Sequence, residues 1–320
     1  MQLCPPVRCS ERARSWIAWR PGCGRDCGRS CRRKPARAPA RRINSYDELP
    51  EIYRQFFDGL PTDHKQPFPY TVLTPTFKGI PRRAQREKLA CLAGEALFIL
   101  EYLGDRLSST CYPLNGRCLV ERGVILLHSW ITIHGPASGG VAKTATLQFN
   151  SVTDHLMAPF VERMRLTPAD GASVDLDLER ERFNYLAQAN YKFYSHGRAS
   201  MRPGDRVLHI LLQPEIRKGQ LAVFGYSISK RLSPAHLTIL TDTELILIRE
   251  DDTQFWLKGP PHGAIWSYVP RSMIESAALV QRNHDLITRE IKVRGDIALS
   301  STFDSGAEAD LQRLVRQVRI

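Results

Sequence analysis

The chain has 320 residues, 42% of them hydrophobic and 24% charged, which is ordinary for a globular protein and long enough for about two domains. Its net charge of +12 falls mainly on residues 1–43, which hold 12 basic and 2 acidic residues, against 33 basic and 31 acidic residues in the remainder. The near-neutral remainder argues against a specific nucleic-acid site in the folded part, and the lack of an apolar run of about 18 residues argues against a transmembrane segment.

The first 43 residues are rich in Arg, Pro, Gly and Cys and show no hydrophobic period. Such a segment buries too little apolar surface to offset chain entropy, so we predict a disordered Arg/Cys-rich tail. Cys23, Cys27 and Cys31 follow the spacing C-x3-C-x3-C, but a zinc site needs four ligands and no histidine lies nearby. We therefore predict no metal site, with a site completed by one of the two earlier cysteines as the alternative.

The three cysteines outside the tail, Cys91, Cys111 and Cys118, lie in the first half of the chain, and the second half contains none. Two halves that share no cysteine pair do not indicate a disulfide framework, which favours a reducing compartment. The apolar run SWIAW near the N-terminus is too short for the core of a secretory signal. We expect a cytoplasmic protein.

Residues 44–68 are predicted to form a short helix and a lead-in to the first strand. The segment SYDE, from Ser45 to Glu48, has the pattern of a capping box. Apolar residues follow it at helical spacing, and DGLP then ends the helix. These apolar residues are Leu49, Ile52, Tyr53, Phe56 and Phe57.

Residues 69–166 are predicted to form a first domain that ends in a helix. ACL and ALFILEY indicate two strands around a tight turn at residues 93–95. GVILLHSWITIHG (residues 123–135) is predicted to be one strand, and ATLQFN another. SVTDHLMAPFVERMR (residues 151–165) is predicted to be a helix, with Pro159 bending it or delaying its start.

Residues 167–204 are predicted to form a helical linker with an aromatic stripe. The simplest interpretation is a strut that packs the two domains together, and a Tyr-rich partner-binding surface is the alternative. The aromatic residues of this linker are Phe183, Tyr185, Tyr191, Phe193 and Tyr194.

Residues 205–320 are predicted to form the second domain. Strands are expected at VLHILLQ, LAVFGYSI, HLTIL, ELILIRE, AIWSYVP, DLITREIKV and IALSSTF. SGAE, which begins at Ser305, is a second capping box, and an amphipathic helix follows with Leu311, Leu314, Val315 and Val318 on one face.

The two domains repeat one another. LACLAGEALFILEY (residues 89–102) aligns without a gap on LTILTDTELILIRE (residues 237–250). Upstream, LTPTFKG from Leu73 matches LQPEIRKG from Leu212, and downstream each copy ends in an amphipathic helix. The period of roughly 150 residues is too long for a solenoid, so the pattern indicates a tandem duplication of a domain.

The second copy resembles the pleckstrin-homology-like (PH/GRAM-type) domains of bacterial proteins. The residues that carry the resemblance are LSPAHLTILTDTELILIRE, IWSYVPRSMIESAALV and the closing helix; in the first copy they are EKLACLAGEALFILEY and SWITIHG. The resemblance covers about two-thirds of the chain. It implies a mainly β, α+β fold: two PH-like small barrels, each capped by a C-terminal helix and joined by the helical linker. It implies a binding or scaffolding role, with no reaction attached.

In lipid-binding members of this family, basic residues between the first two strands hold phosphate groups. The matching loop here is FKGIPRRAQREK, whose basic residues are candidates for an anion site. They are Lys78, Arg82, Arg83, Arg86 and Lys88. The alternative is a solvated loop whose charges serve solubility. The second copy spreads fewer basic residues over a longer loop: Arg217, Lys218, Lys230 and Arg231.

Other candidate sites are weaker. His128 and His134 flank Trp130 on one face of a predicted strand but lie about 20 Å apart, too far to share a metal ion. The chain contains no G-x-S-x-G, G-x-x-x-x-G-K-[ST] or H-E-x-x-H motif, and no helix follows the glycine-rich loop GPASGG. These observations favour a protein without catalytic residues or cofactors.

The sequence therefore predicts a non-enzymatic cytoplasmic binding or scaffold protein with an unidentified ligand. A protein or peptide partner is expected, and an anionic lipid or phosphate is a further possible ligand. Two alternatives stay open: an enzyme with its active site in a cleft between the two barrels, and association with anionic membranes or nucleic acid through the basic tail and the loop at residues 78–88.

Overall fold

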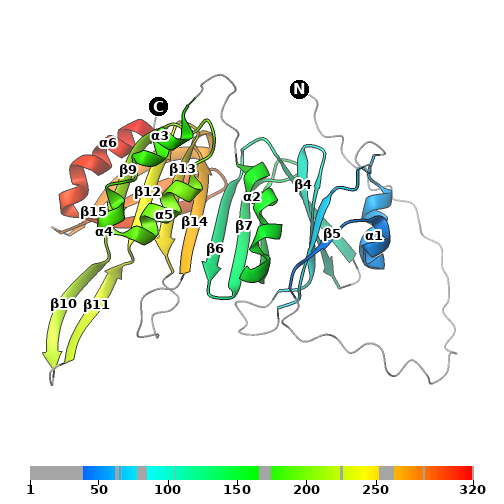
Figure 1. Ribbon diagram of the computed structural model, residues 1–320, viewed down its shortest axis with the longest axis horizontal. Coiled ribbons are helices and arrows are strands. Elements are labelled where there is room, and N and C mark those ends of the chain that lie inside the picture. Colours follow the sequence, from blue (N-terminus) through cyan, green and yellow to red (C-terminus); the bar gives the residue numbers. More distant parts are fainter. Residues whose placement is uncertain are drawn as a thin grey trace.

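The computed structural model describes residues 39–61, 65, 67–77, 85–104, 106–165, 174–223, 226–251, 263–283 and 285–318. This part of the chain is mainly β, with antiparallel sheets side by side and helices on their outer faces (Figure 1). Most of the predicted disordered tail, residues 1–38, lies outside the described residues. The end of that tail was predicted wrongly: Arg41–Ile43 form strand β1, and Ile43 is fully buried.

The first half of the fold contains seven strands after β1 and ends in a helix. Helix α1 (Glu51–Asp58) precedes them, and the 3-10 helix η4 (Ser151–Leu156) leads into helix α2 (Ala158–Met164). The strands are β2 (Tyr70–Thr74), β3 (Lys88–Ala93), β4 (Ala96–Leu103), β5 (Arg106–Pro113), β6 (Leu119–Ile125), β7 (His128–Pro136) and β8 (Ala142–Asn150).

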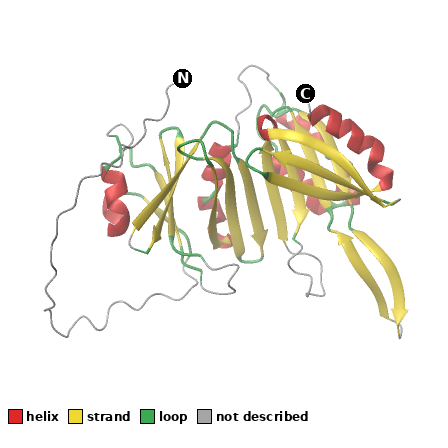
Figure 2. Ribbon diagram, turned by 180° about the vertical axis from the view of Figure 1, so that it is seen from behind, coloured by secondary structure: helices red, strands yellow, loops and turns green. Residues whose placement is uncertain are grey.

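The second half begins with three helices, α3 (Leu176–Glu181), α4 (Leu186–Ala189) and α5 (Tyr191–Ser200), and ends in helix α6 (Glu308–Val318). A hairpin projects away from the rest of the described chain (Figure 2). It consists of β10 (Ile216–Val223) and β11 (Tyr226–Ser233). The other strands are β9 (Val207–Gln213), β12 (His236–Thr241), β13 (Glu244–Glu250), β14 (Gly263–Pro270), β15 (Ile274–Asn283), β16 (Leu286–Val293) and β17 (Ile297–Asp304).

The strands of the two halves pair in the same register. In the first half Leu89 lies opposite Leu100 across β3 and β4, and in the second half Leu237 lies opposite Ile248 across β12 and β13. These are the positions that the sequence alignment superimposes. The tight turns agree as well: Gly94 and Glu95 connect β3 to β4, and Gly94 has the positive φ of +56° that favours glycine.

A helix covers the outer face of the first sheet in each half. In α1, Tyr53 and Phe57 are buried against Leu89 and Leu100. The helices predicted as a strut between the domains cover the sheet of the second half, where α5 packs on β12 and β13, and their buried residues belong to a core that includes residues of both halves. Phe193 of α5 is fully buried in the core, whereas other aromatic side chains of the stripe, Tyr185 and Tyr191, are exposed.

The two halves share one sheet. Strand β6 of the first half pairs antiparallel with β14 of the second, so that the seven strands run in the order β8-β7-β6-β14-β13-β12-β9. Every residue of β14 is buried. Val120 pairs with Tyr268 across this joint, and both belong to one core that continues from the inside of the first half to the helices on the second.

The predicted small barrels are not closed in the described part of the chain. In the first half, side chains rather than a backbone ladder connect β8 to the sheet that contains β3. Gln85 Oε1 accepts a hydrogen bond from Gln148 N at 2.7 Å, and Lys88 Nζ donates one to Thr146 O at 3.1 Å. These bonds satisfy the edge of β8 and leave the two sheets as separate ladders.

The second half repeats this arrangement. Ser233 Oγ donates to Thr302 O at 3.3 Å, and Gln213 Oε1 accepts from Asp304 N at 3.0 Å. At the opposite corner, β14 pairs with β6 rather than with a strand of its own half. Each half is therefore a pair of packed sheets that does not close on itself.

Several local predictions need correction. The long strand predicted over residues 123–135 is a hairpin, β6 and β7, which turns at Leu126 with a positive φ of 54°. β5 and β15 were not predicted. The Ser45 side chain makes no capping hydrogen bond, and Asp304 rather than Ser305 caps the last helical segment through Gly306 N. As predicted, Pro159 lies in the first turn of α2 and delays its start.

We expect Gly123→Ala to weaken the joint between the halves. Gly123 lies on β6 opposite Ile265, and a Cβ atom at this position would collide with the Trp130 ring. Because overpacking of a core costs about 1–3 kcal/mol, the free energy of unfolding should fall by that amount in denaturant titrations. The matched control is Gly59→Ala, whose Cβ would lie 3.5 Å from Phe56 O in ordinary contact, and which should change stability by less than about 0.5 kcal/mol.

Candidate functional site

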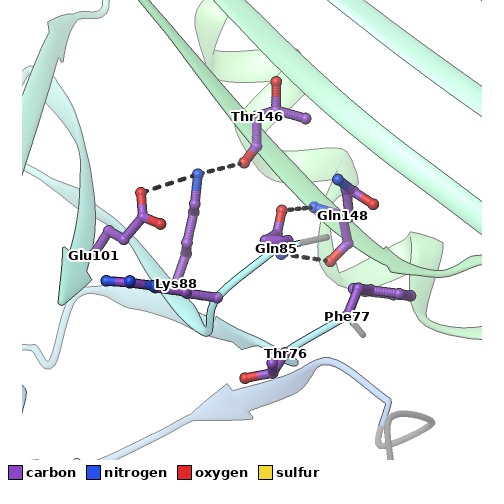
Figure 3. A pocket seen from close by; sticks show the side chains of 8 residues that line it. Thr76, Phe77, Gln85, Lys88, Glu101, Thr146 and Gln148 are labelled. Atoms are coloured by element: carbon purple, nitrogen blue, oxygen red, sulfur yellow. Dashed lines mark hydrogen bonds and ion pairs between the residues drawn. The ribbon is translucent and has the colours of Figure 1, made fainter. Parts of the chain in front are cut away.

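A polar cavity of about 500 Å³ lies where the basic loop returns to the first sheet. Phe77 and Gln85 close the base of this loop through two backbone hydrogen bonds of 2.8 and 3.0 Å. Figure 3 shows the cavity between this loop base, β4 and β8. It is lined by Thr76, Phe77, Gln85, Arg86, Lys88, Glu101, Thr146 and Gln148.

Two of the five predicted anion-binding residues line this cavity, namely Arg86 and Lys88. The other three, Lys78, Arg82 and Arg83, lie outside the described residues. Two of the predicted residues therefore meet at one cavity, and their role in binding an anion stays a prediction.

Lys88 is already engaged. Its Nζ lies 3.2 Å from Glu101 Oε2 on the neighbouring strand β4 and donates to Thr146 O at 3.1 Å on β8 (Figure 3). Arg86 is more exposed, and its Nη1 donates to Tyr102 O at 3.1 Å. The cavity therefore has two cations and one carboxylate, so that its described side chains carry a net charge of +1.

Gln85 is the lining residue that sequence analysis missed. Its side chain is buried, accepts from Gln148 N and donates to Gln148 O at 3.2 Å, and so fixes the spacing of the two sheets at the cavity. Its position was the available signal: it is an uncharged polar residue at the point where the basic loop meets β3. Burial raises the pKa of nearby Glu87, which lies between the two cavity cations in sequence.

The second half does not have the same arrangement of charged residues at the position that corresponds to the cavity. The shared register places His236 where the first half has Lys88, and Arg249 where it has Glu101. Burial lowers the pKa of His236 to about 4, so that its ring is neutral at pH 7. Arg231, on strand β11, is held between Glu215 and Glu250, at 2.7 and 3.0 Å.

His128 and His134 each lie close to a polar side chain of strand β8. Both lie on β7, where His128 Nε2 is 3.1 Å from Gln148 Oε1 and His134 Nδ1 is 2.8 Å from Thr144 Oγ1. Among the described residues, no cluster of three or more His, Cys, Asp or Glu side chains is arranged to hold an ion. The tail cysteines lie outside these residues.

Two buried arginines, Arg165 and Arg289, were not predicted from the sequence. At the end of α2, Arg165 bonds to Glu244, with 3.1 Å between Nε and Oε1, and lies over the Tyr268 ring at 4.1 Å. Arg202 joins the same cluster, because its Nη2 lies 3.2 Å from Glu244 and 3.0 Å from Asp205. Burial alone would lower the pKa of Arg165, but the adjacent Glu244 carboxylate outweighs it and the pKa is raised.

Arg289 on β16 differs because no acidic partner stands beside it among the described residues. Its guanidinium donates to Thr238 Oγ1 at 3.1 Å and to Ser301 Oγ at 3.3 Å, and lies over the Phe303 ring. The residue is only 1% exposed, and its Nε has no hydrogen-bond partner in the described part of the chain. Burial lowers the pKa of Arg289 to about 9, so that the charge is still present at pH 7.

None of the described helices is both long and apolar enough to span a membrane. Comparison of the chain with protein-family models finds no match, and comparison with the sequences of curated proteins finds none either.

Proposed function

We propose that the chain is a non-enzymatic cytoplasmic binding protein made of two PH-like units, and that the first unit takes an anionic group in the cavity at Arg86 and Lys88. Support for the PH-like reading comes from the order of elements. Each half has a sheet of at least four strands, then three further strands, then a helix, with matching registers in the two copies.

The cavity is the observation that carries the anion-binding proposal. Arg86 and Lys88 line it from the end of the basic loop, and backbone and amide groups around Gln85 and Gln148 supply further polar contacts. An anion that binds both Arg86 and Lys88 must compete with the Glu101 carboxylate for the Lys88 ammonium group. We therefore propose a weak and selective site for a phosphate-bearing ligand rather than a strongly cationic surface.

The enzyme alternative requires titratable groups that converge in a cleft between the halves. The halves meet at the strand pair β6–β14, where β14 is buried along its whole length, and the charged groups that meet between the halves, Arg165 and Glu244, are buried rather than open to a cleft. This packing favours a binding role. The alternative of membrane or nucleic-acid association through the tail is tested by removing residues 1–38. The deletion should stop there, because Ala40 and Ile43 are buried in the core.

We expect Glu101→Gln to strengthen anion binding and Lys88→Gln to weaken it, each by about tenfold. The reason is that one charge-assisted hydrogen bond contributes roughly 1.5–3 kcal/mol, and tenfold in affinity corresponds to about 1.4 kcal/mol. The measurement is binding of the full chain to inorganic phosphate by calorimetry, and to vesicles that contain a phosphorylated lipid against neutral vesicles by sedimentation. Binding of phosphate and vesicles alike would indicate a headgroup site, and binding of phosphate alone a soluble ligand.

The matched control is Arg313→Gln, which removes an exposed cation on α6, far in sequence from the loop. If Lys88→Gln and Arg313→Gln weaken binding equally, the interaction is a general charge effect and the cavity is not the site. If binding disappears with residues 1–38 and does not respond to Glu101→Gln, the tail is responsible.

A further inference from the structure

The joint between the halves is made by two different kinds of strand. β14 is the strand that follows the β12–β13 hairpin, and β6 is the first of the last three strands of its half. In the first half the strand that matches β14 is β5, which follows the β3–β4 hairpin. In the second half the strand that matches β6 is β15, the first of the last three strands. Pro113 ends β5 and Pro270 ends β14 at the same register against the preceding strand.

Both matching strands lie at the end of their sheets in the described part of the chain. The five-stranded sheet ends at β5, and the three-stranded sheet ends at β15. Ser138 N donates to Cys111 O at 3.0 Å, on the side of β5 away from β4. Because the backbone groups of alternate residues point the same way along a strand, Leu107 and Ser109 direct their N–H and C=O groups to that outer side.

We propose that β5 of one molecule pairs antiparallel with β15 of a second copy of this chain, and so repeats between molecules the β14–β6 joint within each molecule. The register of β14 against β6 predicts the register of β5 against β15 of the second copy. Ser267 lies opposite Glu121 in the joint, and the matching pair is Thr110 and Val280. Residues 109 and 110 would then pair with residues 281 and 280, before the bulge that β15 has between Gln281 and Asn283.

The surroundings of β5 and β15 resemble those of the β14–β6 joint. In the first half α2 lies beside β6, and in the second half α6 lies beside β15. Pro113 is not an obstacle, since β14 has a proline at the same position and its ladder with β6 ends before it. Val280 is 42% exposed, an apolar side chain on an edge strand that pairing would cover.

Such an interface joins the β5 edge of one copy to the β15 edge of another. Each added copy therefore leaves one β5 edge and one β15 edge of the assembly open to further copies. Heterologous contacts of this type build open chains, or rings where the rotation closes, rather than symmetric dimers. The contact should be weak. β5 offers Ser108, Ser109 and Thr110 at the positions where β14 buries Ile265, Trp266 and Ser267 in the joint.

The test is sedimentation velocity of the full chain over a wide concentration range, with reductant and high salt to suppress contributions from the cysteines and the basic tail. We expect reversible association that continues past two copies. Thr110→Lys combined with Val280→Lys should weaken it by at least about fivefold, since like charges directly opposite each other across strands are destabilising. Thr110→Lys combined with Val280→Glu should restore it.

The matched control is Val152→Lys, which places the same charge on a side chain that is 70% exposed on η4. It should leave association unchanged, and thermal unfolding should show that all variants are folded. A chain that stays monomeric at every concentration would overturn the proposal. So would association that stops at two copies, or a Lys–Glu pair that does not recover what the Lys–Lys pair loses.

Discussion

Replacing Arg289 by isoleucine is expected to raise the free energy of unfolding by roughly 1–4 kcal/mol, as when buried ionic groups are exchanged for apolar residues of similar volume. The first half shows that this core accepts the change. Thr132 lies opposite Thr146 there and Thr288 lies opposite Thr302 here, which places Ile133 at the position of Arg289. Ile133 is fully buried.

The two hydroxyl partners of the guanidinium have apolar counterparts as well. The shared registers match Thr238 with Ala90 and Ser301 with Ala145. Because Arg289→Ile leaves both hydroxyls without their present donor, the triple variant with Thr238→Ala and Ser301→Ala should be more stable than the single variant. The second half would then have the residues of the first half at these three positions.

Denaturant titrations at several pH values check this prediction. The folded-state pKa of about 9 lies below that of an unfolded arginine, so the wild-type chain gains stability as the pH rises above about 9. The advantage of the isoleucine variant should therefore be full at pH 7 and shrink above pH 9. Arg313→Ile, on the exposed face of α6, is the control and should change stability by less than about 0.5 kcal/mol. A large loss of stability in Arg289→Ile would refute the idea that the charge is uncompensated.

Replacing Glu244 by leucine is expected to have the opposite effect, a loss of roughly 3–5 kcal/mol. Glu244 is 1% exposed and is the acid that Arg165 and Arg202 share. Its removal leaves two guanidinium groups close together in the interior with Asp205 as the remaining carboxylate. The cost is that of leaving a buried charge without its partner, rather than of losing one hydrogen bond.

The chain contains a matched control at the corresponding turn of the first half. Glu95 forms an ion pair of 3.9 Å with Arg163, and its side chain is 86% exposed. Glu95→Leu should change the free energy of unfolding by no more than about 1 kcal/mol, because exposed pairs contribute little. Adding Arg165→Met to Glu244→Leu should recover part of the loss, since it removes one unpaired charge. Equal effects of the two glutamate substitutions would contradict the assignment of Glu244 to a buried cluster.

The parts of the fold that could be predicted are those with a local signal. The hairpins β3–β4 and β12–β13 combine apolar strands with a two-residue turn, and the alignment of the halves follows from them. The β6–β7 turn was missed because its residues, Leu126 and Leu127, are apolar and continue the strand pattern. The pairing of β6 with β14 has no local signal, since strands from different halves choose each other by packing.

The candidate site was predictable to a similar extent. The basic loop led to the cavity through Arg86 and Lys88, but Glu101 lies on another strand and its pairing with Lys88 required the register. For Arg289 a signal existed: alternation along LITREIKV places it on the same face as Ile287 and Ile291, which are buried. Arg165 and Glu244 gave none, because they meet only through the fold.

The shared sheet also determines the order in which the molecule can be completed during synthesis. β6 is made long before its partner β14, so a growing chain that has finished the first half carries an unpaired edge with Val120 and Ile125 beside it. Long-range strand pairing is slow and leaves such edges open to other chains. The nascent protein is therefore most vulnerable to aggregation after α2 has been made and before β14 has been made. During this period the ribosome synthesises the helices α3, α4 and α5 and the projecting β10–β11 hairpin.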